Sequence, residues 1–166
     1  MQALIFTDIQ ASGKTTFYRK RFFETHIRIS LDMLTELGAR QDAARVLNEL
    51  SRSLMALGDE AAAARSWREA LRISTETQGM FVTLEALTGI AMLQAKRGES
   101  EPALELLLII LAHPGSIPET KDRASRLRAE LEAQLTRQQV EAAQARVQTK
   151  TFEAVVDEVL RQADLT

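Results

Sequence analysis

Two matching turns divide a long region of helical periodicity, and they constrain the fold more than any other feature. Gly58 and Gly98, 40 residues apart, are each followed by an acidic residue and, five positions on, by an alanine. Four residues after each alanine comes a large apolar side chain, Trp67 in the first copy and Leu107 in the second. A glycine that ends one helix and lets the chain reverse into the next predicts antiparallel helix pairs.

The order of small and large residues in both copies resembles the tetratricopeptide repeat. In the first copy the key positions are Leu47, Leu50, Ser51, Leu54, Gly58, Ala63, Trp67 and Ala70. In the second copy they are Leu87, Ile90, Ala91, Gly98, Ala103 and Leu107. Gln94 and Ile110 depart from the motif. The resemblance implies stacked helical hairpins that bind other proteins.

Helix boundaries continue beyond the second copy. Ser116 and Glu119 have the spacing of a capping box, and Thr136 and Thr151 are expected to cap two further helices. Residues 40–165 resemble the C-terminal helical-repeat tails of large bacterial multidomain ATPases and LuxR-type regulators. Because the ATPase and DNA-binding domains of those proteins are absent here, the resemblance implies an interaction module. We therefore expect residues 38–166 to form a helical repeat domain closed by C-terminal capping helices.

Repeat arrays usually bind along the face formed by the first helix of each pair. Arg45, Asn48 and Arg52 share one face of the first helix and could hold an acidic peptide or a C-terminal carboxylate. The matching positions of the second repeat are Glu85, Thr88, Met92 and Lys96. The alternative interpretation is ordinary solvated surface. Trp67 is expected to fill the core.

The segment 104–112 is apolar on all sides of its predicted helix. Such a helix needs cover from several neighbours. We expect a central helix packed between others. The alternative is an uncovered face through which two copies of the chain associate.

The first 37 residues have a different composition. Five of the eight aromatic residues lie within the first 23 positions. Residues 2–7 predict a short strand, 26–30 predict a second, and a helical stretch lies between them. The predicted fold is thus mainly α, with antiparallel helix-hairpin repeats and a short β-α-β-like N-terminal appendage.

The appendage contains a near match to the phosphate-binding loop, at residues 8–15. Gly13, Lys14 and Thr15 have the required order, while Asp8 replaces the first glycine. The region resembles the start of P-loop polynucleotide-kinase-like ATPases. That resemblance implies ATP bound by Gly13, Lys14 and Thr15, Mg²⁺ held by Thr15, and Asp32 activating an acceptor hydroxyl.

The kinase resemblance stops at about residue 35. No Walker B strand or arginine-bearing lid follows, so the prediction for residues 1–37 is a truncated P-loop-like segment. The leading interpretation is a protein–protein interaction scaffold that is not an enzyme and has no cofactor. The alternatives are an ATP-binding, kinase-like protein with a degenerate loop and a nonfunctional fusion of two gene fragments.

Composition removes several other classes of function. The chain has no cysteine and two histidines, which excludes disulfides and zinc–thiolate sites. Its net charge of −2 makes nucleic acid an improbable partner. No apolar run approaches the roughly 20 residues of a membrane span. A cytoplasmic protein without a membrane partner is expected.

Overall fold

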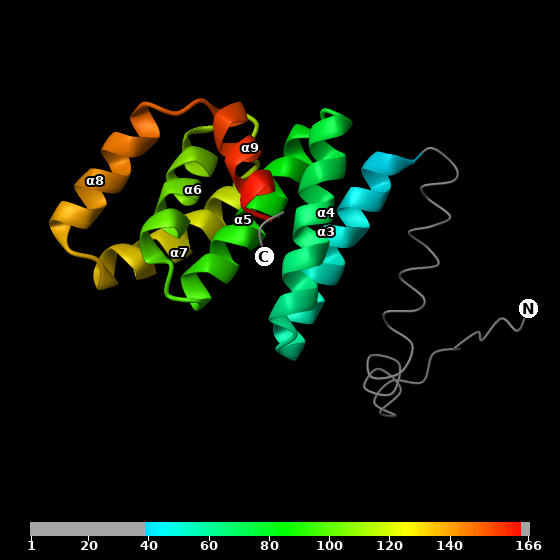
Figure 1. The fold of residues 1–166 in the computed structure, drawn as a ribbon, viewed down its shortest axis with the longest axis horizontal. Coiled ribbons are helices and arrows are strands. Elements are labelled where there is room, and N and C mark those ends of the chain that lie inside the picture. The colour runs from blue at the N-terminus through cyan, green and yellow to red at the C-terminus, as the bar shows by residue number, and fades with distance from the viewer. Residues whose placement is uncertain (1–38, 164–166) are drawn as a thin grey trace, which may run out of the picture.

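The computed structural model describes residues 39–163, which form seven helices joined by short connections (Figure 1). The helices are α3 (Arg40–Leu57), α4 (Glu60–Glu76), α5 (Met80–Lys96), α6 (Ser100–Ala112), α7 (Pro118–Gln134), α8 (Arg137–Gln148) and α9 (Phe152–Ala163). Within residues 39–163 there is no strand, so the mainly α prediction is confirmed. The predicted β-α-β-like appendage and its boundary near residues 37 and 38 lie outside the described residues.

The two predicted glycine turns both end a helix and reverse the chain. Gly58 has φ of 84° and Gly98 has φ of 81°, in the left-handed region that glycine adopts without strain. The amide of the following residue then donates to a carbonyl of the last helical turn, from Asp59 to Leu54 at 3.0 Å and from Glu99 to Gln94 at 2.9 Å. The pairs α3–α4 and α5–α6 are therefore antiparallel hairpins.

A glycine inside a helix allows α4 and α5 to pack closely. Trp67 of α4 is almost fully buried and lies against Gly89 of α5. A Cβ atom on Gly89 would lie 2.1 Å from Cε2 of Trp67. Glycine weakens a helix interior, so its presence here is explained by the space that the indole ring occupies. The predicted role of Trp67 as a core residue is confirmed.

Helix α6 lies at the centre, with α5, α7 and α8 packed against it. Its buried residues are Ala103, Leu104, Leu106, Leu107, Ile109 and Ile110. Within residues 104–112, Leu108 and Leu111 are partly exposed and Ala112 is exposed. The expected central helix is thus observed, while association of two copies through residues 104–112 stays a prediction.

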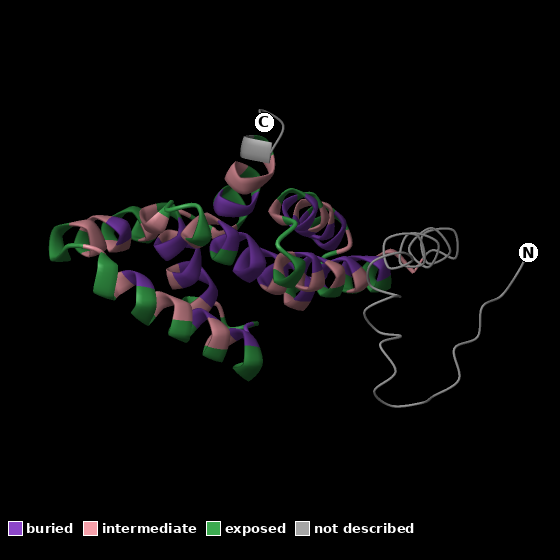
Figure 2. Ribbon diagram, turned by 90° about the horizontal axis from the view of Figure 1, so that it is seen from below, coloured by how far each residue is buried: buried purple, intermediate pink, exposed green. Residues whose placement is uncertain are grey.

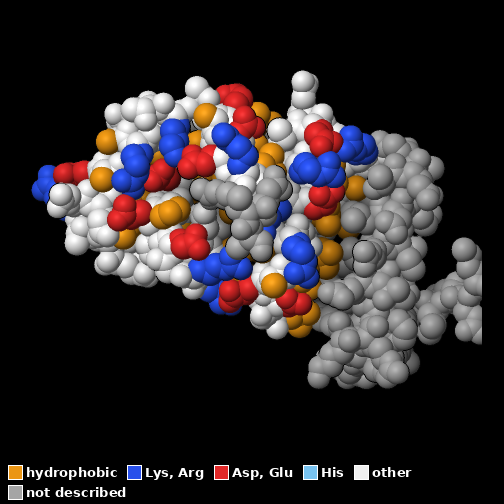
Figure 3. Space-filling model, in the orientation of Figure 1, with side chains coloured by type: hydrophobic (Ala, Val, Ile, Leu, Met, Phe, Trp, Pro, Cys, Tyr) orange, Lys and Arg blue, Asp and Glu red, His pale blue; other side chains and the backbone are white. Residues whose placement is uncertain are grey.

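Helices α7 and α8 each pack against α6 and are more polar than the helices before them. They bury few side chains, and α8 buries only Ala143 among its described residues. Thr136 and Gln139 form a capping box at the start of α8, as a capping role for Thr136 predicted. Figure 2 shows mainly exposed and partly exposed residues in these two helices, and charges of both signs mix over the face seen in Figure 3.

The capping box predicted for Ser116 and Glu119 is wrong. Ile117 precedes the first residue of α7, and no side chain caps that helix. Ser116 is buried, and its hydroxyl donates to the carbonyl of Ile110 at 2.5 Å. The carbonyl of Ile110 belongs to the last turn of α6 and needs a hydrogen-bond donor. The hydroxyl of Ser116 is that donor, so it points toward α6 and does not cap α7.

Candidate peptide-binding face

Helices α3, α5 and α7 lie side by side and form a face that contains an ion-pair network. Glu85 of α5 accepts a hydrogen bond from Arg52 of α3 at 3.2 Å and another from Arg123 of α7 at 3.1 Å. The side chain of Glu85 is 10% exposed, compared with 29% for Arg52 and 36% for Arg123. One carboxylate therefore joins α3, α5 and α7, every second helix along this part of the chain.

The two guanidinium groups keep donors for a further ligand. Arg52 uses its two terminal nitrogens on Glu85 and Glu49, and Arg123 uses one terminal nitrogen on Glu85 and its Nε on the carbonyl of Glu119 at 3.4 Å. An arginine side chain carries five N–H donors in a planar fork. A carboxylate is the group that matches this geometry best. The face is chemically suited to an acidic side chain or a peptide C-terminus.

Two predicted groove residues are structural instead. Asn48 is fully buried, and its Nδ2 atom donates to the carbonyl of Val82 at 3.1 Å, which ties α3 to α5. Thr88 is also buried and donates to the carbonyl of Leu84 in its own helix at 2.8 Å. Both predictions are corrected because close packing of α3 against α5 removes these side chains from the surface.

The other predicted groove residues do not form one cluster. Arg45 is 62% exposed and pairs with Asp42 on its own helix at 3.7 Å. Lys96 reaches Glu60 of α4 at 2.9 Å, on the other side of the repeat pair. Met92 is exposed on α5. The structure brings together Arg52 and Glu85 from the predicted set.

Arg123 is the residue of this network that the sequence interpretation missed. It lies just before the buried Ala124 of α7. Arg52 likewise follows the buried Ser51 of α3. In both helices an arginine stands next to a small buried residue. That pattern could have pointed to Arg123, provided that α7 is expected to continue the face formed by α3 and α5.

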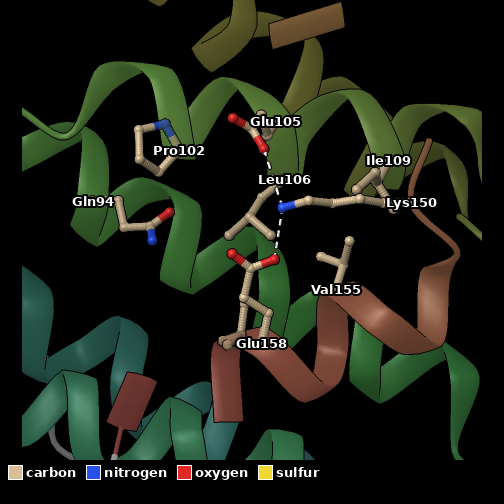
Figure 4. Close-up of a pocket in the computed structure, with 9 residues that line it drawn as sticks. Gln94, Pro102, Glu105, Leu106, Ile109, Lys150, Val155 and Glu158 are labelled. Atoms are coloured by element: carbon tan, nitrogen blue, oxygen red, sulfur yellow. Dashed lines mark hydrogen bonds and ion pairs between the residues drawn. The ribbon is translucent and has the colours of Figure 1, made fainter. Parts of the chain in front are cut away.

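A second polar cluster joins α6, α9 and the segment between α8 and α9 (Figure 4). Lys150 lies between two carboxylates, with Glu158 at 2.6 Å and Glu105 at 3.6 Å. The hydrogen bond to Glu158 is the main cause that raises the pKa of Lys150. The cavity beside it measures about 40 Å³, which leaves room for water and little more. This cluster is best explained as a lock between helices.

The predicted nucleotide site lies elsewhere in the chain. Gly13, Lys14, Thr15 and Asp32 are all outside the described residues, so ATP and Mg²⁺ binding stay predictions. In the part of the chain that the structure describes, no group of three His, Asp or Glu side chains could hold a metal ion. No helix of that part is long and apolar enough to cross a membrane.

Comparison with protein-family models, with curated proteins and with solved structures finds no match to this chain.

Proposed function

We propose that the helical region is a tetratricopeptide-type interaction module that binds an acidic segment of another protein. The observation that carries this proposal is the Arg52–Glu85–Arg123 network, which runs across α3, α5 and α7. The first helices of a repeat array form its usual binding face. A cytoplasmic scaffold without catalytic activity is the role that we propose for it.

The balance of charge in this network supports an anionic ligand. Two arginines share one central carboxylate, and the remaining partner of Arg52, Glu49, is largely exposed. An incoming carboxylate can replace Glu49 at the cost of a weak surface ion pair. The buried neighbours of Arg52 hold its helix in place, so the ligand meets donors that are already positioned.

Fluorescence anisotropy with a library of labelled acidic peptides tests the proposal. Each peptide is measured with a free C-terminus and with an amidated C-terminus. Arg52→Ala combined with Arg123→Ala should weaken the bound peptides roughly 10- to 100-fold, because a charged hydrogen bond contributes about 1.5–3 kcal/mol. Arg137→Ala on the exposed surface of α8 is the matched control and should leave the affinity unchanged.

Two outcomes oppose the proposal. The acidic library could show no saturable binding, or the double variant could bind as tightly as the unaltered chain while remaining folded. Thermal unfolding of each variant separates loss of binding from loss of structure. Glu85 loses both partners in the double variant, so a second variant, Glu85→Gln, measures the effect of the network on stability alone.

The sequence motif at Gly13, Lys14 and Thr15 supports nucleotide binding as a second candidate function. If ATP with Mg²⁺ binds, a concentration 100 times the Kd should stabilise the protein by about 2.7 kcal/mol. Lys14→Ala should abolish that shift. Absence of a thermal shift at millimolar ATP would remove this candidate and leave a fusion of two gene fragments as the explanation of residues 1–37.

A further inference from the structure

A cavity of about 380 Å³ lies on a different side of the molecule from the arginine face. It is formed where the end of α4, the start of α5 and one side of α9 meet. Its lining residues are Ser74, Thr75, Gln78, Met80, Thr83, Phe152, Glu153, Val156 and Asp157. The volume falls within the range of about 300–1,000 Å³ that is usual for small-ligand sites.

Part of this lining is apolar and firmly placed. Val156 is 2% exposed, and the ring of Phe152 lies 4.7 Å from the ring of His113. Met80 is 40% exposed and offers a flexible thioether at the mouth of the cavity. These side chains give an apolar ligand group a surface on which it can be removed from water.

The hydroxyl groups of the lining have already donated their protons. Ser74 and Thr75 both donate to the carbonyl of Leu71, at 3.1 and 2.7 Å. Thr83 lies 2.9 Å from the Ser74 hydroxyl and 3.2 Å from the carbonyl of Gly79. A hydroxyl has one proton and two lone pairs, so these groups now offer acceptors to the cavity.

The charged groups of the lining are also acceptors. Glu153 and Asp157 lie one turn apart on α9, so they share a face of that helix. Among the described residues neither carboxylate takes part in an ion pair or side-chain hydrogen bond, and no lysine or arginine lines the cavity. The last turn of α4 and the first turns of α5 and α9 meet here, so the partial charges of the helix ends oppose one another and the two carboxylates set the sign of the site.

We propose that this cavity binds a cationic side chain on an apolar stem, an arginine or lysine flanked by apolar residues in a partner peptide. Apart from Gln78, whose amide carries both donors and an acceptor, the polar lining offers acceptors, and a ligand rich in N–H donors complements it. The apolar floor covers the methylene groups of such a side chain, while its charged end meets Glu153 and Asp157. The site differs in sign and position from the arginine face.

Isothermal titration calorimetry tests this proposal with an N-acetylated, C-amidated Leu-Arg-Leu tripeptide. The same peptide with citrulline in place of arginine is the neutral, isosteric control. We expect saturable binding of the arginine peptide and at least tenfold weaker binding of the citrulline peptide. Glu153→Gln with Asp157→Asn should cause a similar loss, whereas Glu99→Gln with Glu130→Gln, on exposed positions elsewhere, should cause none.

Three results would overturn the proposal. The arginine peptide could fail to bind, it could bind no better than the citrulline peptide, or n-butylguanidinium alone could bind as tightly as the peptide. The last result would assign the cavity to small organic cations. Arg52→Ala with Arg123→Ala should leave the tripeptide affinity unchanged, so failure of this site and failure of the acidic-peptide face are distinguishable.

Discussion

Helices α3–α6 are joined mainly by buried side chains, whereas α8 is joined to α6 by a smaller apolar contact together with ion pairs. Gly89 admits Trp67 between α4 and α5, and Asn48 joins α3 to α5 from a fully buried position. In α8 only Ala143 is buried, and Arg146 pairs with Glu101 at 2.9 Å and Glu105 at 2.6 Å of α6. Packing therefore dominates in α3–α6, and ion pairs supplement a thinner apolar contact at α8.

The difference fits the position of α8 in the described fold. Helix α8 packs against α6 and leaves most of its surface in water, whereas α5 has neighbours on several sides. Terminal units of repeat proteins carry a polar outer face in the same way. Because surface ion pairs contribute about 0–1 kcal/mol each, α8 should separate from α6 under conditions that leave α3–α6 intact.

The largest expected effect comes from Gly89→Ala. The new Cβ atom would lie 2.1 Å from Trp67, so the indole or the helix must move. Overpacking of this kind costs about 1–3 kcal/mol, and a rigid neighbour places Gly89 near the upper end. Urea unfolding followed by far-ultraviolet circular dichroism measures the change, a signal that also serves in variants without Trp67.

A double-mutant cycle identifies the cause of that loss. Trp67→Phe removes the Nε1 atom, which would otherwise lie 2.2 Å from the new Cβ atom. In that background Gly89→Ala should cost clearly less, or should stabilise through its better helix propensity. An equal cost in both backgrounds would mean that the ring does not require the glycine.

The same residues show what the sequence could predict. Gly58 and Gly98 are local signals, since a helix end with positive φ needs little more than its own turn, and both turns were predicted correctly. Gly89, Asn48 and Thr88 depend on which face of α5 meets α3 and α4, and a sequence without an alignment does not specify that packing. Arg123 was missed for the same reason, because its partner Glu85 lies on another helix pair.

A smaller effect is expected at the turn that joins the first two hairpins. Gln78 has φ of 54°, and the amide of Gly79 donates to the carbonyl of Ser74 at 2.7 Å, as in the two glycine turns. Glycine at this position avoids the strain of a side chain in the left-handed region. Gln78→Gly should raise the free energy of unfolding by about 0.5–1 kcal/mol in thermal or urea unfolding.

The reciprocal change provides the control for that turn. Gly58 also has positive φ, and a Cβ atom there would meet no heavy atom within 4 Å. Gly58→Gln should therefore destabilise the protein through its backbone alone, by about 1 kcal/mol. If Gln78→Gly destabilises instead, contacts of the Gln78 side chain outweigh its backbone strain.

Arg146→Ala should loosen α8 from α6 while α3–α6 stay closed. The variant removes the two ion pairs that Arg146 makes with α6, and the exposure of this side chain keeps the expected loss of stability small. Hydrogen exchange measured by mass spectrometry should become faster in α8, with no change in α3–α6. Arg137→Ala, which removes a pair within α8 to Glu141 alone, should leave the exchange of α8 against α6 unaltered. Faster exchange throughout the protein would show that α8 does not open separately from the other helices.

The smallest effect should come from pH. Hydrogen bonds from Gln139 and then Arg146 lower the pKa of Glu101 below its ordinary value of 4.5, so the docked form of α8 favours the ionised carboxylate. That contribution is complete above the ordinary value and is lost as the pH falls through the lowered one. Exchange in α8 should therefore accelerate as the pH drops below about 4.5, after correction for the intrinsic rate.

Arg40 and then Arg72 likewise lower the pKa of Glu76 in the first hairpin, so acid alone does not isolate α8. Glu101→Gln separates the two, because it should remove the acid-induced acceleration in α8 and retain any change in α4. An α8 response that persists unchanged in Glu101→Gln would contradict the assignment of this acid sensitivity to Glu101.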